Sequence, residues 1–126
     1  MFKKKDTVLI VEEKTSDMLI SSALFNYLGY DVLTSSHESK VIDLVQCRKI
    51  DLLLINVTLP ELKGIRLAQT IRQITPQAKI ILNSDQPANH LSEVNSFMSE
   101  FNFLQKPFWL TDISKIIKET DFAKIN

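Results

Sequence analysis

Short runs of apolar residues recur along the 126-residue chain and predict buried β-strands. Four clear runs lie at residues 7–11, 52–55, 79–82 and 103–105, and a weaker run lies at residues 31–34. The runs are continuous rather than alternating between apolar and polar positions, which is typical of strands that are covered on both faces. The pattern therefore predicts the strands of a parallel sheet.

Helical spacing fills the gaps between these runs. Between residues 17 and 28, Ile20, Leu24 and Leu28 recur every four residues, and Gly29 follows, where glycine adopts a left-handed helix cap at little cost. We interpret this stripe, and four more like it, as the core-facing sides of amphipathic helices. The other four stripes are Val41, Leu44 and Val45; Leu67, Ile71 and Ile74; Leu91, Val94, Met98 and Phe101; and Leu110, Ile113, Ile116 and Ile117.

Strand and helix alternate five times, and this order predicts an α/β fold with a parallel sheet, right-handed crossovers and helices on both faces. We expect one domain over residues 1–126, because no repeat or linker interrupts the pattern. The only glycines are Gly29 and Gly64, so the sequence lacks the glycine-rich loops that bind phosphates in nucleotide-binding proteins.

The composition of the chain excludes several classes of function. The 15 lysines and arginines balance the 15 aspartates and glutamates, so the chain has no excess positive charge to attract nucleic acid or an anionic membrane. The single cysteine, Cys47, excludes an internal disulfide, and no apolar run is long enough to span a bilayer. We therefore expect a cytoplasmic protein, with His37 and His90 at its surface.

Candidate chemistry is located at the strand ends, because open parallel sheets bind ligands at the carboxyl edge of their strands. Carboxylate and carbonyl oxygens at such an edge suit a hard cation such as Mg²⁺, and a lysine there neutralises carboxylates or holds an anion. The polar residues at the predicted ends are Glu12 and Glu13; Asn56; Asn83, Ser84 and Asp85; and Lys106.

These residues also stand in the order and spacing of a known family. Over nearly its whole length the chain resembles the receiver domains of response regulators in two-component signalling. The resemblance rests on VLIVEE at residues 8–13, DLLLINVTLPELKG at 51–64, IILNS at 80–84 and FLQKPF at 103–108. It implies a flavodoxin-like (βα)5 doubly wound sandwich with five parallel strands in the order 2-1-3-4-5.

The resemblance also implies roles for individual residues. Asn56 stands at the phosphoacceptor position, Ser84 at that of the switch hydroxyl, Phe103 at that of the switch aromatic and Lys106 at that of the invariant lysine. It further implies a cis peptide bond between Lys106 and Pro107, since cis bonds are almost confined to proline.

In the same family a magnesium ion is held at this edge. The matching ligands here are Glu12, Glu13 and a nearby backbone carbonyl, that of Thr58. Two departures weaken such a site: Asn56 removes a negative charge, and Glu13 stands where aspartate is usual. We expect magnesium to bind weakly or not at all.

Two other consequences follow from the departures. Asn56 replaces the aspartate whose carboxylate attacks phosphorus, and an amide oxygen is a poor nucleophile. Asp85 stands where a small residue is usual, and its charge would repel an incoming phosphoryl group. Lys106, with no phosphoryl group to bind, is predicted to pair with Glu12 or Glu13.

The sequence thus predicts a signalling module, not an enzyme, that acts through protein contacts without phosphorylation at Asn56. We expect the contact face to comprise the fourth helix, fifth strand and fifth helix, with Phe108 or Trp109 as an anchor, in a monomer or weak homodimer. Alternatives are a switch phosphorylated on Ser84, Thr58 or Asp85, and a module cut from a larger regulator or hybrid kinase. A small enzyme or cofactor carrier on the same fold is a third class, but no nucleophile–base pair supports it.

Overall fold

Five parallel strands form one sheet in the computed structural model, which describes residues 4–57, 63–86 and 101–125. The strands lie in the order β2-β1-β3-β4-β5, and every neighbouring pair is parallel. This direction and order confirm the predicted flavodoxin-like sheet. The strands are β1 (Thr7–Val11), β2 (Asp31–Ser35), β3 (Leu52–Asn56), β4 (Lys79–Ser84) and β5 (Asn102–Gln105).

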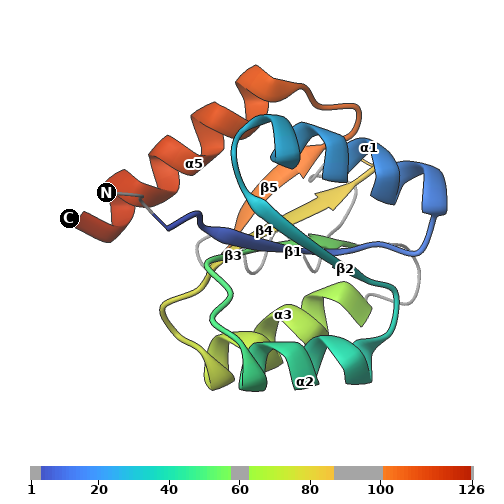
Figure 1. Cartoon of the computed structure of the whole chain (residues 1–126), viewed down its shortest axis with the longest axis vertical. Helices are drawn as coiled ribbons and strands as arrows, with labels where there is room; N and C mark the ends of the chain where they lie inside the picture. Colours follow the sequence, from blue (N-terminus) through green and yellow to red (C-terminus); the bar gives the residue numbers. More distant parts are fainter. Residues whose placement is uncertain (1–3, 58–62, 87–100, 126) are drawn as a thin grey trace.

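Helices cover both faces of this sheet (Figure 1). α1 (Thr15–Tyr27) and α5 (Leu110–Ile125) lie on one face, and α2 (Glu38–Cys47) and α3 (Lys63–Ile74) lie on the other. Of the stripe that predicts a fourth helix, Leu91, Val94 and Met98 lie outside the described residues. Its last member, Phe101, directly precedes β5 and is buried. None of the helices in the described part of the chain combines the length and the apolar character of a membrane span.

Each strand is apolar at consecutive positions because the sheet separates two cores. In β3, Leu53 and Ile55 belong to the core under α2 and α3, whereas Leu52 and Leu54 belong to the core under α1 and α5. Neighbouring residues of a strand point to opposite faces, so a strand with helices on both faces is buried at every position.

Two glycines allow the chain to turn and to pack closely. Gly29 follows α1 with a φ of 93°, a conformation that residues with a Cβ atom rarely adopt. Gly64 lies in the first turn of α3, where an added Cβ would collide with the backbone carbonyl oxygen of Asn56. The missing side chain at position 64 therefore lets α3 begin directly against the end of β3.

One predicted core position in α1 is wrong. Leu24 is buried and Leu28 is half-buried, but Ile20 is 58% exposed. A spacing of four residues advances about 400° around a helix that turns about 100° per residue, so a stripe with this spacing drifts by about 40° at each step. Ile20 therefore lies well around the helix from Leu28 and points away from the sheet.

Candidate functional site

The carboxyl ends of the strands lie beside one another because the strands pair in register. Asn56 of β3 pairs with Asn83 of β4, and Ser84 of β4 pairs with Gln105 of β5. The polar residues predicted from the strand ends are therefore brought to one edge of the sheet.

A largely buried ion-pair cluster lies at this edge. The Lys106 ammonium nitrogen is 2.9 Å from Oε2 of Glu12 and 3.0 Å from Oδ2 of Asp17. The side chain of Glu12 is 2% exposed and that of Lys106 is 12% exposed. The predicted pairing of Lys106 is thus confirmed for Glu12, whereas Glu13 is exposed and has no ion pair with Lys106 among the described residues.

Asp17 is the member of this cluster that the sequence analysis missed. It lies in the first turn of α1, which follows β1 after a short connection. The first turn of a helix that follows a parallel strand lies at the carboxyl edge of that strand, where ligands bind. An acidic residue in that turn was therefore the signal that could have placed Asp17 beside Glu12.

The two carboxylates change the protonation of Lys106. Burial by itself lowers the pKa of the Lys106 ammonium group, but hydrogen bonds to Glu12 and Asp17 and attraction by both carboxylates raise it. The net effect raises the pKa above its ordinary value of 10.5. Lys106 is therefore charged at neutral pH, and its charge is neutralised within the protein.

Several of the oxygen atoms expected to hold magnesium at this edge are engaged in other contacts or replaced. Oε2 of Glu12 bonds Lys106, and Oε1 accepts the backbone N–H of Glu13 at 3.2 Å. Asn56 supplies no negative charge, and Thr58 lies outside the described residues. In the described ranges, no three acidic, histidine or cysteine side chains are placed to hold a metal. Mg²⁺ requires near-octahedral oxygen ligands, so weak or absent magnesium binding at this edge stays a prediction.

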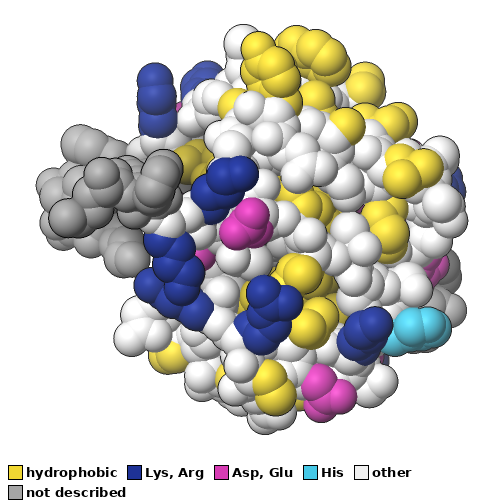
Figure 2. All heavy atoms as spheres, viewed as in Figure 1, with side chains coloured by type: hydrophobic (Ala, Val, Ile, Leu, Met, Phe, Trp, Pro, Cys, Tyr) yellow, Lys and Arg dark blue, Asp and Glu magenta, His cyan; other side chains and the backbone are white. Residues whose placement is uncertain are grey.

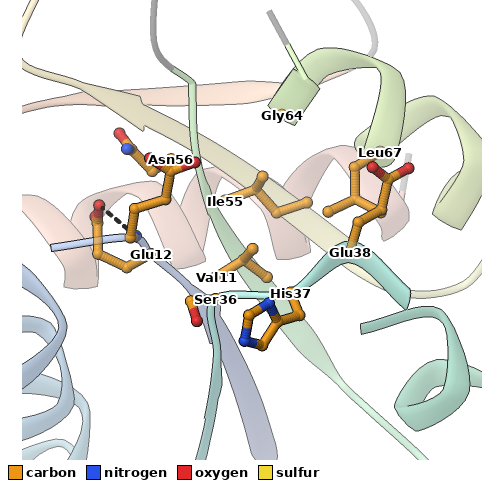
Figure 3. A pocket seen from close by; sticks show the side chains of 10 residues that line it. Val11, Glu12, Ser36, His37, Glu38, Ile55, Asn56, Gly64 and Leu67 are labelled. Carbon is orange, nitrogen blue, oxygen red and sulfur yellow. Dashed lines mark hydrogen bonds between the residues drawn. The ribbon is translucent and has the colours of Figure 1, made fainter. Parts of the chain in front are cut away.

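Asn56 lines a pocket of about 260 Å³ between the strand ends and the starts of α2 and α3. In Figure 3, Asn56 and Glu12 lie at one end of this pocket, and Glu38 and Leu67 lie at the other. Three of the lining residues are acidic, namely Glu12, Glu13 and Glu38, and none of those in the described ranges is lysine or arginine. The described lining of the pocket therefore presents negative charge and an amide, and it includes no lysine or arginine that would attract a phosphoryl group.

Asn83 is the most unusual polar residue of the edge. It is 1% exposed, and neither Nδ2 nor Oδ1 of its side chain has a hydrogen-bond partner within the described part of the chain. An unpaired buried amide costs free energy, because its hydrogen bonds to water in the unfolded chain are not replaced. We expect Asn83 to destabilise the fold at this position.

Ser84 and Asp85 continue from β4. The Ser84 side chain is buried, and its Oγ accepts the backbone N–H of Gln86 at 3.1 Å. The Asp85 side chain is 64% exposed, and its Oδ2 lies 3.8 Å from the ammonium nitrogen of Lys14. These two of the three candidate alternative acceptors thus differ, because the Ser84 hydroxyl has a backbone partner and the Asp85 carboxylate pairs at the surface. The third, Thr58, lies outside the described residues.

The aromatic residues near β5 differ in burial. Phe103 is half-buried against the core under α2 and α3, and Phe108 is half-buried against the core under α1 and α5. Trp109 is 62% exposed, and its backbone N–H donates to Oδ2 of Asp112 at 2.8 Å at the start of α5. The peptide bond between Lys106 and Pro107 is cis, as the resemblance predicts.

His37 and Cys47, two residues singled out from the sequence, do not join the edge cluster. His37 precedes α2 at the surface, as expected, and Cys47 is exposed at the end of that helix. His90 lies outside the described residues.

Comparison with known proteins identifies a family match and several relatives. The family model described as Response regulator receiver domain matches residues 8–118. Sporulation initiation phosphotransferase F of Bacillus subtilis is 19% identical, and the match covers 90% of this chain and 92% of the length of that protein. Autoinducer 1 sensor kinase/phosphatase LuxN of Vibrio harveyi is 26% identical over 88% of this chain, which spans only 13% of LuxN.

Solved structures show the same fold. A CheY-like response regulator receiver domain protein from Methanospirillum hungatei has a TM-score of 0.80 at 19% identity and covers 96% of this chain and 98% of its own. Vibrio cholerae chemotaxis protein CheY4 has a TM-score of 0.79 at 18% identity and covers 93% of this chain and 99% of its own.

Proposed function

The chain belongs to the response regulator receiver family of two-component signalling, and from this premise we propose that it signals through protein contacts without phosphorylation at residue 56. Asn56 is the observation that carries the proposal. It ends β3, lines the pocket at the carboxyl edge and stands where the family has its phosphoacceptor. An amide in place of a carboxylate offers no oxygen anion to attack phosphorus.

The ion pairs of Lys106 support the same proposal. The Lys106 ammonium group bonds both Glu12 and Asp17, so its charge is already neutralised by two carboxylates. A lysine in this state is less able to bind a phosphoryl group, because the new anion would compete with both partners. The acidic lining of the Asn56 pocket would add repulsion.

We propose that the described part of the predicted contact face takes part in binding a protein partner. β5 and α5 belong to it, whereas the predicted fourth helix lies outside the described residues. Trp109, directly before α5, is a large apolar residue that is 62% exposed. Exposed tryptophans commonly anchor protein interfaces. Phe108 packs against the core, so we assign the anchoring role to Trp109.

Intact-mass measurement after incubation with magnesium and acetyl phosphate tests the phosphorylation proposal. We expect no added phosphoryl group on the wild-type chain. Asn56→Asp is the matched variant, because it changes only the side-chain amide to a carboxylate at that position. A hydroxylamine-sensitive adduct on Asn56 would contradict the proposal, and an adduct on Ser84, Thr58 or Asp85 would favour the alternative acceptors.

Affinity capture tests the proposed face. Trp109→Ala should reduce recovery of protein partners, since it removes the exposed ring without changing the backbone hydrogen bond to Asp112. Gln73→Ala, at an exposed position of α3 on the opposite face of the sheet, is the matched control. Equal recovery with all three proteins would remove Trp109 from the contact face.

A further inference from the structure

The outer face of α1 is free of charge along its whole length. Six exposed residues form one stripe, because each lies three or four positions along the helix from at least one other member. We call this stripe the α1 face. It consists of Ser16, Leu19, Ile20, Ala23, Asn26 and Tyr27.

The α1 face is more apolar than a solvent-facing stripe usually is. Leu19, Ile20 and Tyr27 are 65%, 58% and 78% exposed, and they are three of the four large hydrophobic residues that the described chain exposes. Figure 2 shows hydrophobic side chains gathered over α1 and over the chain leading into α5. Solvent-facing sides of helices normally carry charged residues, so this face has the character of an interface.

The other described helices provide a comparison within the same chain. α2 exposes Glu38, Lys40 and Asp43, whereas α3 exposes Arg66 and α5 exposes residues such as Lys115. The one charged residue of α1, Asp17, is half-buried and paired with Lys106.

Ala23 lies in the middle of the α1 face. A small residue at this point allows a second helix to approach closely, with the larger Leu19 and Ile20 on one side of the crossing and Tyr27 on the other. The face therefore has a shape that suits a packed helix.

The N-terminal end of α1 is acidic. Glu13 is exposed directly before the helix, and the neighbouring Lys14 is paired with Asp85 at 3.8 Å. The three side chains together carry one net negative charge.

The C-terminal end of α1 is basic. Lys4, Lys5 and Asp6 are exposed and line a pocket together with Leu28 and Gly29, the residues that follow the helix. The three charged side chains of this lining carry one net positive charge.

We propose that the α1 face is a self-association surface, on which a second copy of this chain packs its own α1 antiparallel about a two-fold axis near Ala23. In this arrangement the Glu13 end of each helix lies against the Lys4 and Lys5 end of the other. Two opposite charge contacts then form by symmetry, and the two helix dipoles are antiparallel. The uncharged centre brings no like charges together.

Sedimentation analysis of the whole chain, up to about 1 mM, tests this proposal. Ala23→Glu should weaken the dimer at least about tenfold, because two carboxylates would meet near the axis. Alanine and glutamate are both good helix formers, so circular dichroism should show an intact fold. Gln73→Glu adds the same charge on the opposite face of the sheet and should leave the dimer unchanged.

A charge exchange tests the antiparallel arrangement. Glu13→Lys and Lys5→Glu should each weaken the dimer, and the double variant should restore it, since the two sites meet across the axis. A wild-type chain that stays monomeric, or a dimer that tolerates Ala23→Glu, would overturn the proposal. A monomer that binds a different protein through α1, with binding lost in Ala23→Glu, would overturn self-association and assign the face to that partner.

Discussion

The ammonium nitrogen of Lys106 lies 2.9 Å from a carboxylate oxygen of Glu12, although 94 positions separate the two residues in the chain. The contact joins the end of β1 to the end of β5, on opposite sides of β3 and β4 in the sheet order. Asp17 completes the cluster from α1. Three elements are therefore connected by charges that are largely withdrawn from water.

Removing the cation of this cluster should destabilise the fold. Lys106→Met keeps a long apolar side chain but leaves the Glu12 carboxylate, at 2% exposure, without its cation. Breaking a buried ion pair in this way costs about 3 kcal/mol of unfolding free energy. Urea denaturation measures the change, and Lys115→Met, at an exposed position of α5, should cost little. Equal losses in the two variants would show that the Glu12 contact does not stabilise the fold.

The cluster also predicts a response to alkaline pH. The pKa of Lys106 is raised above 10.5, so the folded chain binds this proton more tightly than the unfolded chain. The resulting stabilisation is fully present below pH 10.5 and is lost as the pH rises through the folded-state pKa.

The free energy of unfolding of wild type and of Lys106→Met, compared at about pH 8 and about pH 11.5, isolates this contribution. The advantage of the wild type should shrink at the higher pH. An advantage that stays constant would mean that the Lys106 proton is not held more tightly in the folded chain.

The unpaired amide of Asn83 should be replaceable with a gain in stability. Asn83→Leu keeps the number and branching of the side-chain heavy atoms and removes two polar atoms that lack hydrogen-bond partners in the described part of the chain. We expect the free energy of unfolding to rise by about 1–2 kcal/mol. Asn83→Asp, which buries a charge at the same place, should lower it. A loss of stability in Asn83→Leu would indicate that the amide has a bonding partner such as a buried water.

The two glycines should differ in their tolerance of alanine. Gly64→Ala places a Cβ against the carbonyl oxygen of Asn56, so either α3 or the end of β3 must move. Gly29→Ala meets no atom and is opposed only by its φ of 93°, at a cost of about 1–2 kcal/mol. Thermal denaturation should show the larger loss for Gly64→Ala, and the reverse order would contradict the close approach of α3 to β3.

Periodicity was sufficient to predict the five strands and the helices α1, α2, α3 and α5 around them. Continuous apolar runs such as residues 52–55 and helical stripes such as Leu67 and Ile71 can be recognised from neighbouring residues alone. The runs are continuous because each strand is buried on both faces of the sheet. The order of the five strands came from the resemblance to a family, because periodicity does not specify which strands are neighbours. The same resemblance predicted the cis bond before Pro107.

Ile20 shows where a local pattern is insufficient. Its spacing matches that of Leu24 and Leu28, yet its side chain is 58% exposed on the α1 face. The spacing of apolar residues around a helix can be read from the sequence. Which side of the helix faces the sheet depends on how all of its side chains pack.

By itself, the sequence determined that Asn56 ends the third strand and that a lysine and two glutamates share its edge. Only the tertiary structure decided that Lys106 pairs with Glu12 and Asp17 and that Asn83 is buried without a hydrogen-bond partner among the described residues. The reason is physical: strands and helices follow from contacts between near neighbours in the chain, whereas ion pairs and desolvation depend on atoms that folding brings together from distant segments.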